Sequence, residues 1–152
     1  MGEILTVPNP ILLQKASRVR EIDEEIENLV EKMQHLVEFS EGRVGLAAPQ
    51  IGVLKRIFLI KPSQGLPIQI FINPKLVWVS SERTHTPVKE AREGCLSVPE
   101  VSKIIDRHKS IRVVYQALNG YSKEERFDGW AARIIQHEND HLNGVLITSP
   151  RI

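Results

Sequence analysis

The order of hydrophobic patterns along the chain constrains its fold more than any other feature. Apolar residues first recur at helical spacing, from Ile22 to Val37, and then in short runs bounded by Gly, Pro and Asn. Helical spacing returns near the end, from Trp130 to His141. Because a parallel sheet would need alternating strands and helices, this order predicts an α+β domain with antiparallel strands packed on two helices.

Local signals place the limits of these elements. Asp23 is the predicted N-cap of an amphipathic helix that runs to about Ser40. Asp128 is the predicted N-cap of a second helix that ends before Gly144. Asn119-Gly120 predicts a tight antiparallel hairpin. The predicted strands are residues 56–60, 68–72, 75–79, 110–118 and 123–127, with an Asn-Pro pair separating the second from the third.

Composition limits the classes of function. The 152 residues are 41% hydrophobic and 26% charged, which predicts one domain over residues 1–152 with a core of its own. Lys and Arg number 20 against 19 Asp and Glu, so a net charge of +1 provides no bulk attraction to DNA or to an anionic membrane. The sequence has neither a membrane-spanning apolar run nor a signal-peptide pattern. We therefore expect a cytoplasmic monomer that binds neither DNA nor membranes.

The second predicted helix carries His137-Glu138-Asn139-Asp140-His141. Residues four apart lie on one face of a helix, so both imidazoles reach the same ion, while Glu138 approaches solvent at that ion without being a ligand. A chance match is expected in roughly less than one chain in a hundred of this length. The alternative is a surface helix with solvated histidine and acidic side chains. The motif favours a hydrolytic metal site.

Such a site needs three protein ligands and one open position, so one ligand is still to be found. Cys95, the single cysteine, is the candidate, and it has no partner for an intramolecular disulfide. It lies in Glu93-Gly94-Cys95-Leu96-Ser97, where Gly94 permits close approach of the backbone. A lone cysteine in an apolar run is more often a small core residue. Only the two histidines favour the ligand over that alternative.

A third segment, residues 44–52, is rich in small residues and carries one amide side chain, Gln50. Small residues let a substrate lie against the backbone, and an amide donates a hydrogen bond to an oxygen that gains negative charge in a transition state. By itself this segment would be taken for an ordinary loop.

Together, the three segments resemble the motifs of the peptide deformylase family, which are of the types Gly-x-Gly-x-Ala-Ala-x-Gln, Glu-Gly-Cys-Leu-Ser and Gln-His-Glu-x-Asp-His. Their order and rough separation match, and the resemblance extends over nearly the whole chain. It implies an α+β fold with antiparallel sheets around the helix that carries the histidines. It also implies a metal-dependent hydrolase that removes the N-formyl group from N-formylmethionyl peptides and releases formate.

The resemblance also implies roles at individual positions. Cys95, His137 and His141 would hold the ion, and Glu138 would take a proton from the attacking water and pass it to the leaving amine. The residues placed around the reacting carbonyl are Gln50, Leu96 through its backbone N–H, and Gly45. The residues placed in the substrate pocket are Arg43, Val44, Glu93, Gly94, Trp130, Arg133 and Ile134. The residues placed behind the ligands are Gln136, Arg107 and Asp140, together with Glu93.

Some of these positions have other interpretations. Trp130 fits a core position equally well, and each residue behind the ligands fits a plain structural ion pair. Arg43 replaces the first glycine of the family motif, so we expect a long cation at the lip of the cleft. Its alternative is a solvated rim residue.

The resemblance extends to the cofactor, the partners and the compartment. The family favours Fe(II), and zinc, nickel and cobalt forms also occur, so the sequence does not choose the metal. The chain ends at Ile152 and resembles short forms without a C-terminal docking helix, so any ribosome contact is expected to be transient. If the protein is phage-encoded, we expect the host cytoplasm, in preference to an organelle.

Two other functions compete with this interpretation. A generic His-Glu-x-x-His peptidase takes its third ligand from a downstream His, Asp or Glu, and the eleven residues after His141 contain none. A deformylase-like binding or regulatory protein would have lost part of the catalytic set. Gln50, Glu138 and all three candidate ligands are present, and only Arg43 supports that alternative.

Overall fold

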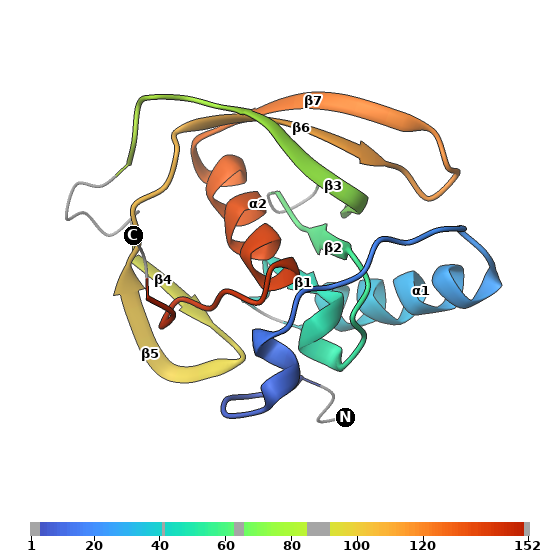
Figure 1. Cartoon of the computed structure of the whole chain (residues 1–152), viewed down its shortest axis with the longest axis horizontal. Helices are drawn as coiled ribbons and strands as arrows, with labels where there is room; N and C mark the ends of the chain where they lie inside the picture. Colours follow the sequence, from blue (N-terminus) through green and yellow to red (C-terminus); the bar gives the residue numbers. More distant parts are fainter. Residues whose placement is uncertain (1–3, 41, 63–65, 85–91, 151–152) are drawn as a thin grey trace.

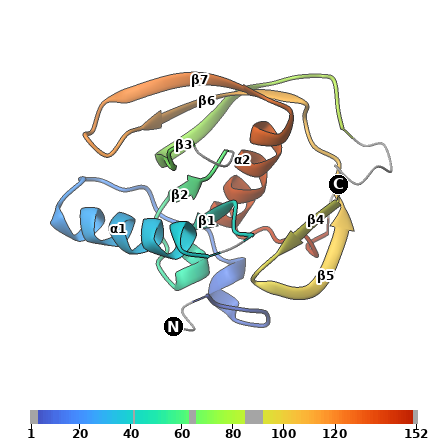
Figure 2. The same cartoon turned by 180° about the vertical axis from the view of Figure 1, so that it is seen from behind.

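The computed structural model describes residues 4–40, 42–62, 66–84 and 92–150. Its strands form two sheets, one of five antiparallel strands in the order β1-β2-β3-β6-β7 and one of two strands, β4-β5. The helix α2 lies between them (Figures 1 and 2). The elements are η1 (Pro10–Leu13), α1 (Glu24–Glu38), β1 (Gly45–Ala47), η2 (Ala48–Ile51), β2 (Ile57–Ile60), β3 (Gln69–Val79), β4 (Arg92–Cys95), β5 (Val98–Ile104), β6 (Ser110–Gln116), β7 (Ser122–Asp128) and α2 (Gly129–Leu142). The predicted α+β class with antiparallel sheets is confirmed.

The five-stranded sheet is buried on both faces around β2, whereas β7 is largely exposed. Every residue of β2 is fully buried. Successive side chains of a strand point to opposite faces, so both faces of the sheet are covered at β2. Phe58 packs with α2 in one apolar cluster, and Leu59 packs with α1 in another. α2 therefore packs through apolar side chains on one face of the sheet.

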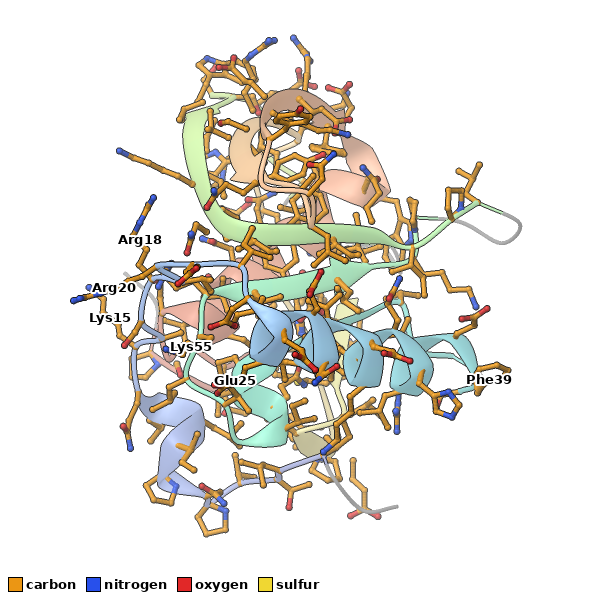
Figure 3. All side chains as sticks on the ribbon, turned by 90° about the vertical axis from the view of Figure 1, so that its right-hand side faces the viewer. Lys15, Arg18, Arg20, Glu25, Phe39 and Lys55 are labelled. Carbon is orange, nitrogen blue, oxygen red and sulfur yellow. The ribbon has the colours of Figure 1, made fainter. Side chains whose placement is uncertain are left out.

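The N-terminal helix follows the sequence prediction closely. Asp23 caps α1 by accepting a hydrogen bond from the Ile26 N–H at 3.1 Å, and the helix ends at Glu38, two residues before the predicted limit. Glu25 lies near its beginning and Phe39 just past its end (Figure 3). No helix in the described ranges is both long and apolar enough to cross a membrane.

The prediction of two strands around Asn73-Pro74 is wrong. The strand β3 continues through this pair, and its pairing with β6 changes register between Ile72 and Lys75. Asn73 adopts a positive φ of 52°, and its side-chain amide exchanges hydrogen bonds with the backbone of Val19 at 2.7 and 2.8 Å. Asparagine tolerates this conformation, so the pair forms a bulge instead of ending the strand.

The second helix starts and ends where predicted, but its cap differs. Asp128 occupies the N-cap position without a side-chain capping bond, because its carboxylate accepts from Ser110 and Arg126 instead. At the other end, Gly144 has a φ of +73°, and a Cβ there would lie 2.6 Å from the Leu13 carbonyl oxygen. Only glycine fits both the conformation and this close approach.

The predicted hairpin at Asn119-Gly120 is confirmed as the turn between β6 and β7. Three further strands were not predicted as strands. β1 has three residues, β4 has four and β5 has seven. Strands as short as β1 and β4 give too few alternating positions for a period-2 pattern, and the apolar residues Val98, Val101 and Ile104 of β5 recur at every third position instead of every second.

Candidate metal centre and its surroundings

Cys95, His137 and His141 converge in the structure. Each offers one ligand atom, and these three atoms lie within 4.8 Å of one another. The two histidines are one turn apart on α2, and Cys95 ends β4, next to the turn Leu96–Ser97. Its sulfur lies 3.3 Å from Nε2 of His141. Two elements far apart in sequence thus supply a compact set of sulfur and nitrogen donors.

These donors fit a divalent metal ion. Nδ1 of His137 donates to Oε1 of Glu93 at 2.9 Å, which leaves Nε2 for an ion. One thiol and two imidazoles form the donor set expected for zinc or a similar first-row ion. Nδ1 of His141 is buried with no partner among the atoms that the structure describes.

The two histidines differ in charge preference. Burial opposes protonation of His137, but its hydrogen bonds with Cys95 and Glu93 outweigh burial and raise its pKa to about 10. Burial and the nearby His137 lower the pKa of His141 to about 3. Because ligand imidazoles must be neutral, binding of an ion here would release a proton from His137.

A buried ionic cluster lies behind His137. Glu93 accepts both from Arg107, at 2.8 and 2.9 Å, and from Arg133 at 2.5 Å. Arg107 also pairs with Asp140 at 2.7 Å. Burial opposes ionisation of Glu93, but the hydrogen bonds from Arg107 and His137 outweigh it and hold its pKa well below the usual range. A charged, fixed carboxylate therefore orients the His137 ring.

The supporting residues differ in how directly they act. Arg107 donates to Glu93, which in turn contacts His137. Asp140 accepts from Arg107 and lies on α2 next to His141. The side-chain amide of Gln136 accepts from the His108 N–H at 3.0 Å and donates to the His108 carbonyl oxygen at 2.9 Å. It also donates to the Ala132 carbonyl oxygen. Its contribution is to hold the segment beside Arg107 against α2.

Glu138 lies beside the candidate ligands as a buried carboxylate. It is 4% exposed, and its Oε1 has no hydrogen-bond partner among the described residues. Burial raises its pKa to about 7. A Cβ on Gly45 would come within 2.5 Å of its Oε2, so the glycine leaves the space that this carboxylate occupies.

Gln50 presents its amide nitrogen to the site. Its Oε1 accepts from the Ala47 N–H at 3.0 Å, and its Nε2 donates to Ser97 Oγ at 3.2 Å and faces the Cys95 sulfur at 3.8 Å. Ser97 is fully buried and was not singled out in the sequence, although it belongs to the quoted cysteine motif. It fixes the direction of the Gln50 amide.

A cavity of about 720 Å³ opens beside these groups. All seven predicted pocket residues line it, as do Gly45, Gln50, Cys95, Leu96, His137 and Glu138. Trp130 is 53% exposed, so it lies at the mouth of the cavity and not in the core. The lining residues that the sequence did not single out lie on β4 and β5, which were not predicted as strands, with the exception of Gly42; they are Gly42, Arg92, Val98, Pro99, Glu100, Val101 and Ser102.

Arg43 lines the cavity, as expected, but its charged end is held back. Its Nη1 donates to the Leu36 carbonyl oxygen of α1 at 3.0 Å. The guanidinium thereby satisfies a carbonyl near the C-terminal end of the helix, where a cation is favoured. Similarly, Arg133 is among the residues that line the cavity, but its guanidinium is buried against Glu93.

Comparison with known proteins agrees with this site. The family model for polypeptide deformylase matches residues 1–151. A peptide deformylase of Thermotoga maritima is 41% identical over 147 residues, covering 97% of this chain and 85% of that protein. The crystal structure of the peptide deformylase from Thermotoga maritima matches with a TM-score of 0.87 at 40% identity over 97% of both chains.

Two further solved structures are similar. A probable peptide deformylase from Synechococcus phage S-SSM7 matches with a TM-score of 0.84 at 38% identity, covering 94% of this chain and 95% of that one. The peptide deformylase of Synechococcus elongatus in complex with actinonin matches with a TM-score of 0.84 at 36% identity, covering 94% and 74%. The chain therefore belongs to the polypeptide deformylase family, metal-dependent hydrolases that remove the N-formyl group from nascent chains.

Proposed function

We propose that this chain performs the family reaction at an ion held by Cys95, His137 and His141, with Glu138 as the general base. The observation that carries the proposal is the buried Glu138 carboxylate, which packs on Gly45 beside the three donor atoms. The ion would act as a Lewis acid that polarises the formyl carbonyl and makes water a nucleophile near neutral pH.

The chain's own residues would handle the proton and the developing charge. A carboxylate with a pKa of about 7 is matched to proton transfer at neutral pH, so Glu138 takes the proton of the attacking water and delivers it to the leaving amine. The Gln50 amide and the Leu96 backbone N–H stabilise the oxyanion. The fixed Gln50 amide supports this role, because donors that need no reorganisation stabilise a transition state most.

The substrate would bind as an extended N-formylmethionyl peptide. β1 is the edge strand of the large sheet, and Gly45 on it lines the cavity, so a peptide strand can pair there. Val44, Trp130 and Ile134 would contact the methionine side chain. Arg43 stays at the rim, where its bond to Leu36 supports an open entrance.

The setting of the reaction is also a proposal. We infer a single catalytic domain over residues 1–152 that acts as a monomer in the cytoplasm and contacts ribosomes only transiently. Fe(II) is the physiological ion that we favour, while Zn(II), Ni(II) and Co(II) fit the same donors.

The test is formate release from formyl-Met-Ala-Ser by protein purified anaerobically with Fe(II). We expect activity in the wild type and its collapse in Glu138→Ala, with metal content unchanged in both. Arg43→Gly is the matched control at the rim and should retain activity. A wild type with a full metal complement and no formate release would overturn the proposal.

A further inference from the structure

Two arginines converge on the one carboxylate that supports His137. Glu93 Oε2 accepts from Arg133 Nη1 at 2.5 Å and from Arg107 Nε at 2.9 Å, and its Oε1 accepts from His137 Nδ1 at 2.9 Å. The side chains of Arg133 and Glu93 are only 5% and 6% exposed. A single carboxylate thus separates the Arg133 guanidinium from a candidate ligand imidazole.

The same guanidinium also extends away from the site, to Thr84. Its Nη2 donates to the Thr84 carbonyl oxygen at 3.0 Å and to Thr84 Oγ1 at 2.6 Å, and its Nη1 donates to the Ile105 carbonyl oxygen at 2.9 Å. Thr84 is not among the residues that line the cavity. Hydrogen bonds therefore run without a break from Thr84, outside the cavity, through Arg133 and Glu93 to His137.

We propose that Arg133 is a positioning residue that fixes Glu93, and through it His137, so that the metal ion stays bound. Its planar guanidinium reaches four oxygen acceptors at once, which the point charge of a lysine cannot do with the same geometry. The inference rests on the metal site of the proposed function but not on its substrate.

Charge and geometry predict opposite effects when Arg133 is replaced. The cluster balances Arg107 and Arg133 against Glu93 and Asp140. Loss of one cation leaves an excess negative charge near the ion, which by attraction alone would retain a divalent cation longer. Loss of positioning would shorten its retention instead. The sign of the effect therefore separates the two explanations.

The experiment measures release of Co(II) from loaded protein into excess chelator. We expect about 10-fold faster release in Arg133→Met, the lower end of the range for residues that support ligands indirectly, and a smaller increase in Arg133→Lys. Thr84→Val removes only the remote hydroxyl and should change release in the same direction. In the Arg133→Met background, Thr84→Val should have no further effect, because the connection is already broken.

A second measurement distinguishes positioning from substrate contact. Because the guanidinium is buried against Glu93, KM for formyl-Met-Ala-Ser should stay unchanged in Arg133→Lys while kcat falls. Arg126→Met is the matched control, since that arginine is exposed and pairs with Asp128 on β7. Met33 lies on the fully buried face of α1 and is not among the residues that line the cavity, so Met33→Ala should lower stability but release metal at the wild-type rate.

The possible results distinguish positioning by Arg133 from an effect of its charge alone. Slower release in Arg133→Met with wild-type release in Arg133→Lys would overturn the inference in favour of charge alone. Equal release in all variants, or faster release in Met33→Ala as well, would also overturn it. If Arg133→Met fails to fold, Arg133→Lys and Thr84→Val decide the question. A wild type that binds no metal would overturn the proposed function, and this inference with it.

Discussion

Glu138 combines two demands that oppose each other at the scale of a single residue. Burial without a full set of hydrogen-bond partners raises its pKa to about 7, which suits a base that works at neutral pH. The same burial makes its ionised form costly in the folded protein. Glycine at position 45 leaves the space for the carboxylate. The burial that suits Glu138 to catalysis therefore lowers the free energy of unfolding, and this loss depends on pH.

We predict that Glu138→Gln stabilises the metal-free protein at alkaline pH. Between the ordinary glutamate pKa of 4.5, which applies to the unfolded chain, and the folded value of about 7, the folded state keeps a proton that the unfolded state has lost. The free energy of unfolding therefore falls as pH rises through this range, and above pH 7 the loss of stability has reached its full size. Urea unfolding with chelator present should show a gain of about 1–3 kcal/mol for Glu138→Gln at about pH 8 and none near about pH 4.5. An equal gain at both pH values would contradict the prediction.

Gly45→Ala should damage the same site from the other side. The added Cβ meets Glu138 Oε2 at 2.5 Å and displaces the carboxylate, so kcat should fall about 100-fold while metal content is retained. Unfolding should show a loss of about 1–3 kcal/mol from overpacking. In the Glu138→Ala background that loss should disappear, since the contact is gone. A loss that persists there would place the strain in the backbone of β1.

The sequence predicted the reacting residues better than their supports. His137 and His141 were found because ligand chemistry restricts both residue type and helical spacing, and Cys95 because the two histidines still need a third ligand. Thr84 and Ser97 were not singled out, because a hydroxyl or carbonyl that meets a buried arginine or amide depends on tertiary contact. The direction of the Arg133 guanidinium, away from the pocket, is set in the same way.

At the scale of elements, the end of α2 determines how the catalytic helix joins the rest of the chain. Gly144 brings the backbone after the helix against Leu13, the last residue of η1. The Ala16 N–H also donates to the Leu142 carbonyl oxygen at 2.8 Å. The N-terminal segment thus holds the last turn of the helix that carries His141.

We predict that Gly144→Ala is far more destabilising than Gly120→Ala. Both glycines have positive φ, +73° and +89°, but only at position 144 would the new Cβ clash, 2.6 Å from the Leu13 oxygen. Gly120→Ala should cost about 1 kcal/mol from strain alone, and Gly144→Ala about 3 kcal/mol or more. Urea midpoints of the two variants measure the difference. Equal midpoints would show that the clash relaxes at no cost.

Elements with long patterns were predictable, and short or irregular ones were not. α1 and α2 each carry an apolar stripe over several turns, and the β6–β7 hairpin has a strong turn signal. The Asn73-Pro74 pair gave a false break, because turn residues also form bulges when a side chain such as Asn73 bonds a neighbouring segment. β4 was missed as a strand because it has only four residues, and β5 because its apolar residues do not alternate with polar ones.

At the scale of the whole molecule, the candidate ligands join the two sheets. Cys95 comes from β4, while the histidines come from α2, which packs on the five-stranded sheet. The cluster of Glu93, Arg107 and Asp140 spans the same boundary. An ion bound by all three ligands would therefore hold the small sheet to the large one.

Metal removal should consequently lower global stability. An ion at about 1,000 times its dissociation constant stabilises the folded state by about 4 kcal/mol, provided that it does not bind the unfolded chain. We predict a lower Tm after chelation, its recovery on adding Zn(II), and no recovery in Cys95→Ser at the same metal concentration. Full recovery in Cys95→Ser would show that the cysteine is not needed for the stabilising site.

The separation of the two sheets has a practical consequence for engineering. No backbone ladder joins β4–β5 to the five-stranded sheet within the described parts of the chain, so the register of the large sheet does not depend on side chains of β5. Glu100, Val101 and Ser102 nevertheless form part of the cavity wall. A randomised library at these three positions would sample new peptide preferences while leaving the scaffold that carries both histidines intact. Selection for specificity and selection for robustness can then proceed independently in one protein.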